Sequence, residues 1–367
     1  MSGAGGPRAE LPSDIAPLLI DWQRRAGRSG MPWQGIRDPY RVWLSEVMLQ
    51  QTQVSTVLGY YARFLERFPD VGALAAAEAD EVMALWGGLG YYSRARNLHR
   101  CAQAVVKQHG GQFPSTAAGL ETLPGIGAST AAAIASFCFG ERVSIVDGNV
   151  RRVLTRLLAF EGDLAQTKPQ RALWEMAQAL LPIDPSADEM TAYTQGLMDL
   201  GATVCTRSRP ACGGCPMQGI CRGYHAGEPQ RFPVKTRTLK RRHESWWLLL
   251  VRLEGGQARF WLQRRPASGI WAGLYCPPVY VSEQAAHAVL PQVWRDRLIA
   301  LEAVSHSLTH RELRLHPLLL ELGSEPSPGE LPEGQWVDAD QLSQHGLPAP
   351  VKLLLKAALA PDLFSRA

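Results

Sequence analysis

The stretch CTRSRPACGGCPMQGIC, residues 205–221, places four cysteines within seventeen residues. The spacing C-x6-C-x2-C-x5-C puts a close pair, Cys212 and Cys215, between Cys205 and Cys221, which arrive from longer loops. Such loops can close a cage of four thiolates around an inorganic centre, and both a zinc ion and an iron–sulfur cluster accept four cysteines. The spacing alone therefore predicts a metal centre and leaves both metals open.

The cysteines are expected as thiols rather than as disulfides. The chain has 7 cysteines in 367 residues, and its first residues, MSGAGGPRAE, lack the basic start, apolar core and cleavage site of a secretory signal. Disulfide frameworks are typical of small secreted proteins that are dense in cysteine. We therefore expect a cytoplasmic protein.

Length and composition favour a globular protein of two domains. A chain of 367 residues exceeds what one core usually serves, and an apolar content of 46% is ordinary for packed folds. The longest apolar runs, such as SWWLLLV at residues 245–251, are of strand length. No membrane partner is therefore expected, and the net charge of +4 says little by itself.

The basic charge is concentrated in residues 223–243, which hold six Lys or Arg, one acid and two prolines. The basic residues are Arg231, Lys235, Arg237, Lys240, Arg241 and Arg242. This composition predicts an extended linker, which near nucleic acid would meet phosphates. We therefore predict one domain at residues 1–222, a basic linker at 223–243 and a second domain at 244–367.

Before the linker, apolar residues recur at helical spacing between clear turn signals. The predicted helices span residues 15–25, 40–52, 60–68, 80–86, 94–108, 128–139, 149–160 and 171–181. After the linker, SWWLLLVRLE and QARFWLQRR flank two glycines as a hairpin, and ELRLHPLLLEL suggests a further strand. Short helices are expected near 282–290 and 351–359. The fold class is thus α+β, with an all-helical domain followed by a mixed domain.

Two glycines precede a predicted helix in LPGIGAST, residues 123–130. Because Gly125 and Gly127 lack side chains, their backbone N–H groups are exposed next to the positive end of that helix. This arrangement can bind phosphate and is typical of a helix-hairpin-helix, which contacts the DNA backbone rather than base edges. An ordinary turn between two helices explains the same residues.

Asp147 in SIVDGNVRRVL comes directly before a predicted helix that begins near Asn149. An aspartate there caps the helix, and capping alone explains its position. The cap also keeps the carboxylate ionised, as a group that faces a developing positive charge must be. Arg151 and Arg152 follow as expected phosphate contacts.

Glu46 lies among apolar residues in YRVWLSEVMLQQTQV. The residues four positions away along a helix are Val42 and Gln50, so a surface ion pair does not explain it. A glutamate without a countercharge in apolar surroundings has a raised pKa and can act as a general acid, although a solvated helix face explains it too. The amides of Gln50, Gln51 and Gln53 could meet base edges.

Six motifs, in order, resemble the helix-hairpin-helix DNA glycosylase superfamily, and within it the MutY-type adenine DNA glycosylases. They are MPWQ (31–34), WLSEVMLQQTQV (43–54), GLGYYSRARN (88–97), LPGIGAST (123–130), VDGNVRR (146–152) and MDLGATVCTRSRPAC (198–212). The resemblance spans nearly the whole chain. It implies one 4Fe-4S cluster rather than zinc, with a structural role beside the DNA-facing loop TRSRPA. The implied ligands are Cys205, Cys212, Cys215 and Cys221.

The resemblance also implies roles for single residues. Glu46 matches the catalytic acid, and Asp147 matches the carboxylate that stabilises the oxocarbenium-like sugar. The residues that match the adenine pocket are Trp33, Leu49 and Gln195. The residues that match contacts to DNA are Gln51, Tyr91, Gly125, Gly127, Ser129, Asn149 and Arg151. Excision would resemble glycoside hydrolysis of a flipped-out nucleotide, in which the protonated adenine leaves and water adds to the sugar.

Ser129 separates two classes of enzyme. Endonuclease III-type glycosylase/lyases carry at this position a lysine that forms a Schiff base with the sugar, and serine cannot do so. The resemblance therefore implies a monofunctional glycosylase. A bifunctional pyrimidine-lesion glycosylase/lyase and a non-catalytic iron–sulfur DNA-binding protein are the alternatives.

The second domain resembles the Nudix-like domain with which MutY-type proteins sense 8-oxoguanine opposite adenine. The sequence lacks the Nudix box G-x5-E-x7-R-E-x2-E-E, so nucleotide hydrolysis is not expected. In HSLTHREL the family's aromatic-serine-histidine triplet becomes Leu308-Thr309-His310, which leaves Thr309 and His310 as the implied lesion contacts. The resemblance implies a monomer that acts on double-stranded DNA with A:8-oxoguanine or A:G mispairs, associated with the nucleoid if the protein is bacterial.

Overall fold

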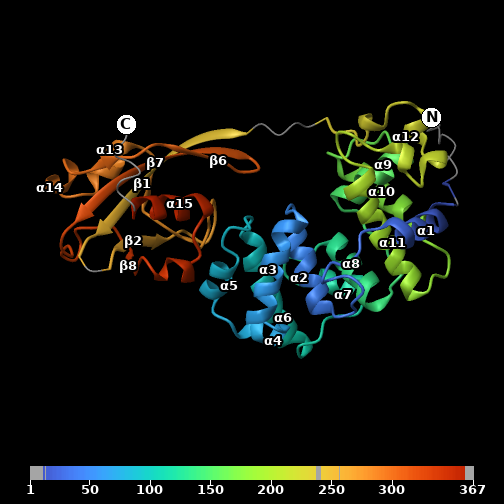
Figure 1. Cartoon of the computed structure of the whole chain (residues 1–367), viewed down its shortest axis with the longest axis horizontal. Helices are drawn as coiled ribbons and strands as arrows, with labels where there is room; N and C mark the ends of the chain where they lie inside the picture. The colour runs from blue at the N-terminus through green and yellow to red at the C-terminus, as the bar shows by residue number, and fades with distance from the viewer. Residues whose placement is uncertain (1–10, 13, 237–240, 256, 360–367) are drawn as a thin grey trace, which may run out of the picture. The chain divides into compact units, whose positions relative to one another are not determined.

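The structure is a computed structural model of the chain, and it describes residues 11–12, 14–236, 241–255 and 257–359 (Figure 1). These residues form two compact units. The first comprises the described parts of Met1–Gln51 and Cys101–Thr238, and the second those of Thr52–Arg100 and Leu239–Ala367. The helical half of the sequence therefore contributes to both units, which the sequence pattern does not predict.

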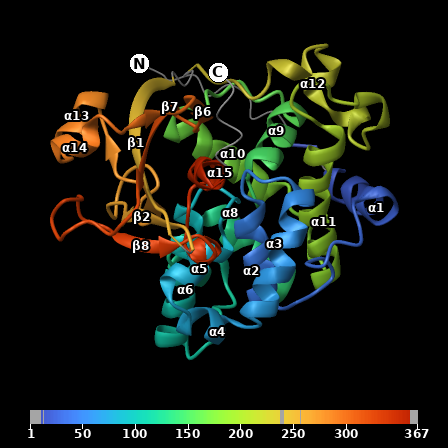
Figure 2. The same cartoon turned by 60° about the vertical axis from the view of Figure 1, so that its left-hand side comes forward.

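The first unit is helical. Its helices are α1 (Ile15–Ala26), α2 (Pro39–Leu49), the end of α6 (Ser93–His109), α7 (Ala117–Glu121), α8 (Ala128–Phe139), α9 (Gly148–Leu157), α10 (Thr167–Ala179), α11 (Ala187–Asp199) and α12 (Arg222–His225). Shorter turns are η1 (Leu200–Val204), η2 (Cys212–Gly214), η3 (Gln218–Ile220) and η4 (Pro229–Arg231). Figure 2 shows α1 alongside α11. Helix α8 is buried over most of its length because its small alanines let α2, α7 and α11 pack closely around it.

The eight predicted helices are confirmed, with shifted ends. The helix predicted at 40–52 ends at Leu49, because Gln51 has a positive φ of 57° that a helix does not allow. Among the helices before the sheet, the prediction missed α4 (Val71–Ala76), α7, α11 and the short α12. The start of α11 carried a readable signal, since Ser186 and Glu189 form a capping box.

The basic segment predicted as an extended linker is packed over part of its length. Arg231 forms an ion pair with Glu161, and Phe232 is buried. The backbone N–H of Leu164 donates to the carbonyl of Val234. The sequence did not indicate this ordered segment, because prolines and basic residues are typical of linkers. The contacts that hold the segment in place come from residues distant in sequence. Residues 237–240 of the segment, with Arg237 and Lys240, lie outside the described residues, and the predicted domain boundaries stay a prediction.

The second unit combines helices with a mixed sheet. The helices before the sheet are α3 (Val54–Arg67), α4, α5 (Ala79–Leu85) and the start of α6. The strands are β1 (Arg242–Leu253), β2 (Arg259–Arg264), β3 (Tyr275–Cys276), β4 (Val279–Tyr280), β5 (Ile299–Ala300), β6 (Val304–Ser307), β7 (Arg311–Leu322) and β8 (Gln335–Asp338). The remaining elements are α13 (Glu283–Ala288), α14 (Gln292–Arg295), η5 (Gln341–Gln344) and α15 (Ala349–Ala358).

Strands β1 and β7 pair in parallel at the centre of the order β3-β2-β1-β7-β5. The predicted hairpin is confirmed as the antiparallel pair of β1 and β2. Leu249 and Val251 pack with Leu290, next to α13, whereas Arg252 donates to the carbonyl of Ala358 in α15. Cover on both faces explains why residues 248–253 are all buried. Helices before residue 241 and a mixed sheet after it confirm the predicted α+β fold class.

Within the described ranges, none of the helices combines the length and the apolar character needed to cross a membrane.

Candidate active site

Glu46 lies on α2, whose start is fixed by Asp38. The Asp38 carboxylate accepts hydrogen bonds from the backbone N–H groups of Tyr40 and Arg41. Pro39 is favourable in the first turn of the helix, where its missing N–H is not needed. Residues 42–45, 47 and 48 of this helix are buried, and Glu46 is partly exposed among them. The helix therefore holds one carboxyl group at the edge of an apolar core.

Burial, and secondly the charge of Asp147, raise the pKa of Glu46 to about 8. Glu46 therefore holds a proton at neutral pH and can donate it. The second cause shows that the two carboxyl groups act on one another although they are far apart in the sequence. The structure thus brings together the two residues predicted as catalytic.

Asp147 is the N-cap of α9, and its carboxylate accepts the backbone N–H of Val150 at 2.7 Å. The cap and two neighbouring arginines lower its pKa, but burial outweighs them and raises the pKa overall. Burial thus acts against the cap, which was expected to keep Asp147 ionised. Since the charge of Asp147 acts on Glu46, Asp147 ionises while Glu46 still holds its proton.

The predicted glycine turn joins α7 to α8. Gly125 has a φ of 78°, which would strain any residue with a side chain, and Gly127 precedes α8 as its N-cap. No atom lies within 4 Å of a Cβ built at Gly127, so the backbone is open there. Ser129 is the second residue of α8 and is half-buried. The structure thus confirms a helix-hairpin-helix with an accessible helix N-terminus.

The residues predicted to line the adenine pocket come from three segments. Trp33 is buried in the loop between α1 and α2, and Leu49 is the last residue of α2. Gln195 on α11 donates its side-chain N–H to the carboxylate of Asp199 at 2.8 Å. Asp199 also accepts from Arg28, at the start of the loop that holds Trp33. One buried carboxylate therefore connects two of the three predicted segments.

Gln51, predicted as a DNA contact, is exposed directly after α2 and has a φ of 57°. A positive φ in a residue other than glycine is a strained conformation, which is concentrated at functional sites. The neighbouring Gln50 amide donates to the Thr130 hydroxyl on α8 at 3.4 Å. The end of α2 is thereby connected to the helix that follows the glycine turn.

Tyr91, in the second unit, is also strained, with a φ of 47° and 44% of its surface exposed. The buried Arg94 holds its loop by donating to the carbonyls of Leu89 and Gly90. The Arg94 guanidinium lies 5.5 Å from the centre of the Tyr91 ring, and burial lowers the pKa of Arg94 to about 10. Sequence reasoning missed Arg94, because an arginine in a polar motif usually lies on the surface.

Thr309 and His310 are exposed in the turn between β6 and β7. The turn is closed by a hydrogen bond of 2.8 Å from the backbone N–H of Leu308 to the carbonyl of Arg311. The Thr309 and Tyr91 hydroxyls form a hydrogen bond of 3.2 Å across 218 positions of sequence. The structure thus joins one predicted DNA contact to one predicted lesion contact.

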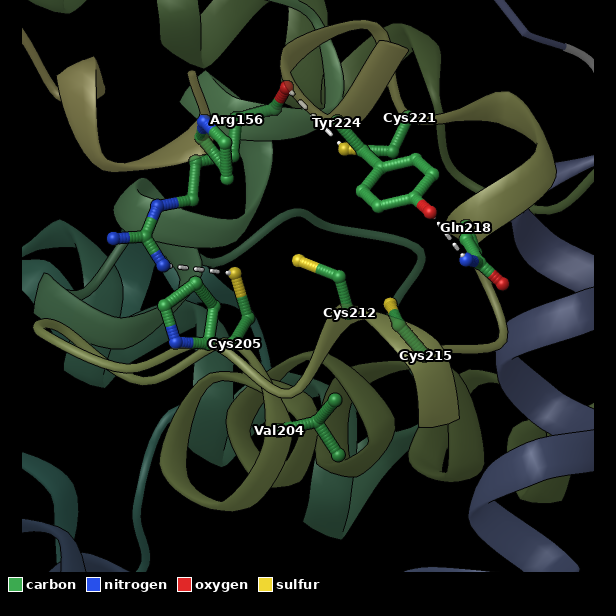
Figure 3. A pocket seen from close by; sticks show the side chains of 10 residues that line it. Arg156, Val204, Cys205, Cys212, Cys215, Gln218, Cys221 and Tyr224 are labelled. Atoms are coloured by element: carbon green, nitrogen blue, oxygen red, sulfur yellow. Dashed lines mark hydrogen bonds between the residues drawn. The ribbon is translucent and has the colours of Figure 1, made fainter. Parts of the chain in front are cut away.

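The four predicted cysteine ligands line one cavity, and Figure 3 shows their sulfur atoms facing the same space. None of the seven cysteines forms a disulfide. In the part of the chain that the structure describes, no three His, Cys, Asp or Glu side chains are grouped closely enough to hold a single metal ion. Four thiols around one cavity are a donor set that a 4Fe-4S cluster can bind, with one thiolate on each iron.

Burial raises the pKa of Cys215 to about 11, and burial likewise raises the pKa of Cys221. A thiol in such surroundings becomes a ligand when a bound cationic centre removes its proton. The chemistry of the donor set therefore fits an iron–sulfur cluster.

Two arginines of α9 support the cysteine loop. Arg156 is buried, donates to the carbonyls of Thr206 and Arg207, and places Nη1 at 3.4 Å from the sulfur of Cys205. Arg152 donates to the Cys205 carbonyl at 2.7 Å. Nε and Nη2 of Arg152 are bonded within the protein, so its expected contact to phosphate stays a prediction.

The predicted DNA contacts on α9 differ in their surroundings. The side-chain oxygen of Asn149 accepts from Arg152 at 2.8 Å. Arg151 is half-buried, and its charge lowers the pKa of Asp147. Arg152 and Arg156 are four residues apart and share one helix face, which is the signal that could have placed both at the cysteine loop.

Comparison with known proteins agrees with this geometry. Residues 44–179 match the HhH-GPD superfamily of base excision DNA repair proteins, residues 205–221 match the iron–sulfur binding domain of endonuclease III, and residues 247–357 match the NUDIX domain. The chain is similar to the adenine DNA glycosylase of Buchnera aphidicola subsp. Acyrthosiphon pisum, with 32% identity over 93% of this chain and 97% of that one. It is also similar to the adenine DNA glycosylase of Mus musculus, with 34% identity over 94% of this chain and 79% of that one.

Among solved structures, a thermostable thymine-DNA glycosylase covers 58% of this chain and 95% of its own, with 26% identity and a TM-score of 0.51. The iron–sulfur match covers all four cysteines of the cavity and confirms the 4Fe-4S cluster as the cofactor. Relatives matched over almost their full length confirm the resemblance drawn from the six motifs. The chain belongs to the adenine DNA glycosylase family.

Proposed function

We propose that this protein hydrolyses the N-glycosidic bond of adenine mispaired with 8-oxoguanine, or with guanine, in double-stranded DNA. Its family makes it a DNA N-glycosylase of base excision repair, and the choice of opposite base and the roles of single residues are proposed in addition. The feature that supports the chemistry is the pKa of Glu46, which burial and the charge of the Asp147 carboxylate raise to about 8.

The two carboxyl groups can divide the reaction between them. Glu46 donates its proton to N7 of the extruded adenine, and the electron pair of the C1′–N9 bond leaves with the base. The Asp147 carboxylate stabilises the cationic sugar until water adds to C1′, and the proton released by that water restores Glu46. The products are free adenine and an abasic sugar.

Ser129 supports a monofunctional reaction. It lies at the start of α8, directly after the glycine turn, and its hydroxyl cannot form a Schiff base with the sugar. Water is then the group that adds to C1′, and the strand stays intact after the base has left.

The hydrogen bond between Tyr91 and Thr309 supports recognition of 8-oxoguanine. The oxidised base differs from guanine by a carbonyl at C8 and an N–H at position 7. A threonine hydroxyl can donate to the first and accept from the second, and the exposed His310 offers a further ring nitrogen. Tyr91, which would contact the DNA duplex near the lesion, and Thr309, which would contact the oxidised base, would then act as a pair.

The cluster would be held by Cys205, Cys212, Cys215 and Cys221, and it would supply a structural cross-link within residues 205–221. Arg156, through its bonds to that loop, would keep the loop in place for the DNA backbone. We further propose, from the family resemblance, that the protein acts as a monomer in the cytoplasm, on the nucleoid if it is bacterial.

The test uses duplexes with adenine opposite 8-oxoguanine, guanine, cytosine or thymine, each analysed with and without alkali. We expect base loss opposite 8-oxoguanine and guanine, fastest opposite 8-oxoguanine, with strand breaks that appear only after alkali. Breaks without alkali would support a lyase instead. Equal rates opposite all four bases would contradict the proposed substrate.

A matched pair of variants tests the lesion contact. Thr309→Val keeps the shape of the side chain but loses the hydroxyl, whereas Thr309→Ser keeps the hydroxyl. We expect Thr309→Val, and not Thr309→Ser, to lower the ratio of the rates opposite 8-oxoguanine and opposite guanine.

A further inference from the structure

We propose that Asp199 is a positioning residue that orients the side-chain amide of Gln195, and that it thereby makes the pocket select a base with an exocyclic amino group. The inference rests on the proposed function and on the family resemblance, which implies that Gln195 lines the adenine pocket. It adds a reason why that pocket accepts adenine and rejects purines that carry a carbonyl at the same position.

Asp199 is the last residue of α11 and is completely buried. Its Oδ1 accepts from Nε of Arg28 at 2.8 Å and from Nε2 of Gln195 at 2.8 Å. Its Oδ2 accepts from the backbone N–H of Arg28 at 3.0 Å. The buried carboxylate is thus paired with one guanidinium and has three donors, of which Gln195 supplies one.

A carboxylate paired in this way offers acceptors and no donor. The amide of Gln195 has two different ends, an NH2 group that donates and an oxygen that accepts. Turning the amide around would place its oxygen against Oδ1 of Asp199 in a buried site, which is costly because neither atom carries a hydrogen. Asp199 therefore fixes the NH2 end toward itself and leaves Oε1 of Gln195 as the group available to a base.

An exposed acceptor discriminates between purines. Adenine carries an amino group at C6, whose hydrogens can bond to Oε1 of Gln195. Hypoxanthine and guanine carry a carbonyl oxygen at C6, which would face another acceptor. A site built to bond one such group rejects the analogue that lacks it, because the buried polar atom is then left unpaired.

The loop that follows α1 packs closely against the Asp199 carboxylate. A Cβ placed on Gly27 would lie 2.5 Å from the backbone oxygen of Gln23 and 3.1 Å from Oδ2 of Asp199, so the chain at that position has no room for a side chain. The side chain of Gln34 donates to the Arg28 carbonyl at 3.0 Å and so closes the loop that contains Trp33. The carboxylate that orients Gln195 thus also anchors the loop that carries a second predicted pocket residue.

The experiment measures single-turnover excision of adenine and of hypoxanthine, each opposite 8-oxoguanine, by the full chain with its cluster. The proteins are the wild type, Asp199→Asn, Gln195→Leu and the double variant. An asparagine at 199 both donates and accepts, so it can pair with Gln195 in either orientation. We expect Asp199→Asn to lower the adenine-to-hypoxanthine rate ratio at least about fivefold, the effect of one hydrogen bond. In the Gln195→Leu background the same change should not alter the ratio.

Thr194→Val is the matched control. The Thr194 hydroxyl shares a buried hydrogen bond of 2.8 Å with Ser136 and lies next to Gln195 on the same helix, but it does not bond to Asp199. We expect this variant to lower the melting temperature and to leave the rate ratio unchanged. A change of ratio in Thr194→Val as large as that in Asp199→Asn would show that general loosening of α11 is sufficient, and it would overturn the inference.

The outcomes separate the two proposals. A wild type that excises no adenine opposite 8-oxoguanine would contradict the proposed function itself. A wild-type ratio in Gln195→Leu would remove Gln195 from base selection and would overturn only the inference. Suppose that Gln195→Leu changes the ratio. The role of Asp199 alone would then be overturned if Asp199→Asn leaves the ratio unchanged, or if the two effects add in the double variant.

If Asp199→Asn does not fold, Gln195→Glu tests the same contact with Asp199 intact. Two carboxyl groups at hydrogen-bond distance cannot both ionise at neutral pH, so one of them holds a proton. We expect an additional ionisation in the pH profile of adenine excision by Gln195→Glu that Gln195→Leu lacks. Identical profiles in these two variants would overturn the contact.

Discussion

Glu46 and Asp147 carry the same functional group in the same unit, but the two regions that hold them differ. Glu46 lies within the length of α2, beside buried apolar residues, and burial is the main cause of its raised pKa. Asp147 lies at the start of α9, where backbone N–H groups and two arginines oppose the effect of burial. Burial raises the pKa of both carboxyl groups, and only for Asp147 do hydrogen bonds and positive charges oppose that effect.

Position within a helix therefore changes how strongly burial raises the pKa of a carboxyl group. A carboxylate at a helix N-terminus meets unpaired N–H groups and the positive end of the dipole, whereas one along the helix meets only side chains. Pairs of titratable groups whose environments separate their pKa values are typical of acid and base roles. Variants of Glu46 and Asp147 test this difference.

Glu46→Gln should have the largest effect. The amide keeps the size of the side chain but has no acid proton, so the single-turnover rate of adenine excision should fall by about 10²- to 10⁴-fold. Binding of the duplex, measured by fluorescence anisotropy, should be retained. An unchanged rate would remove Glu46 from the mechanism.

Asp147→Asn removes the other charge and should slow excision by about 10²- to 10³-fold. Asparagine caps a helix about as well as aspartate does, so the melting temperature should change little. Asp70→Asn, at the cap of α4 where Asp70 accepts from Ala73, is a matched control that should leave the rate unchanged. A rate loss explained by unfolding in Asp147→Asn would contradict the electrostatic role.

The pH profile should report the proton on Glu46. Since the pKa of Glu46 is about 8, the excision rate should fall as the pH rises through that value, by about tenfold per unit well above it. The residual rate of Glu46→Gln should lack this fall. A wild-type profile that stays level up to pH 10 would place the acid elsewhere.

The smallest of these effects should be the change that the Glu46 proton makes to the free energy of unfolding. The pKa of Glu46 is raised in the folded state from its ordinary value of 4.5 to about 8, so the folded protein binds the extra proton between these values. The free energy of unfolding should therefore fall as the pH rises from about 4.5 to about 8 and stay low above it. Glu46→Gln should melt a few degrees above the wild type at pH 8.5 and show a smaller difference at pH 5. Equal differences at both pH values would contradict the raised pKa.

Much of the fold and part of the site follow from local sequence. Apolar periodicity predicted eight helices, the two glycines of LPGIGAST predicted the turn before α8, and cysteine spacing predicted the metal centre. The missed α11 had a capping box that was present in the sequence and was not used. These features are readable because each depends on residues within a few positions of one another.

The sequence by itself determined which chemical groups are present: two carboxyl groups, four thiols, an open glycine turn and a serine where a lysine would form a Schiff base. Only the tertiary structure decided their partners. It placed the charge of Asp147 near Glu46, Arg156 at the cysteine loop, and the Thr309 hydroxyl on that of Tyr91. Such contacts join residues far apart along the chain, and burial then sets how strongly each group holds its proton, because desolvation depends on what surrounds a group and not on its neighbours in sequence.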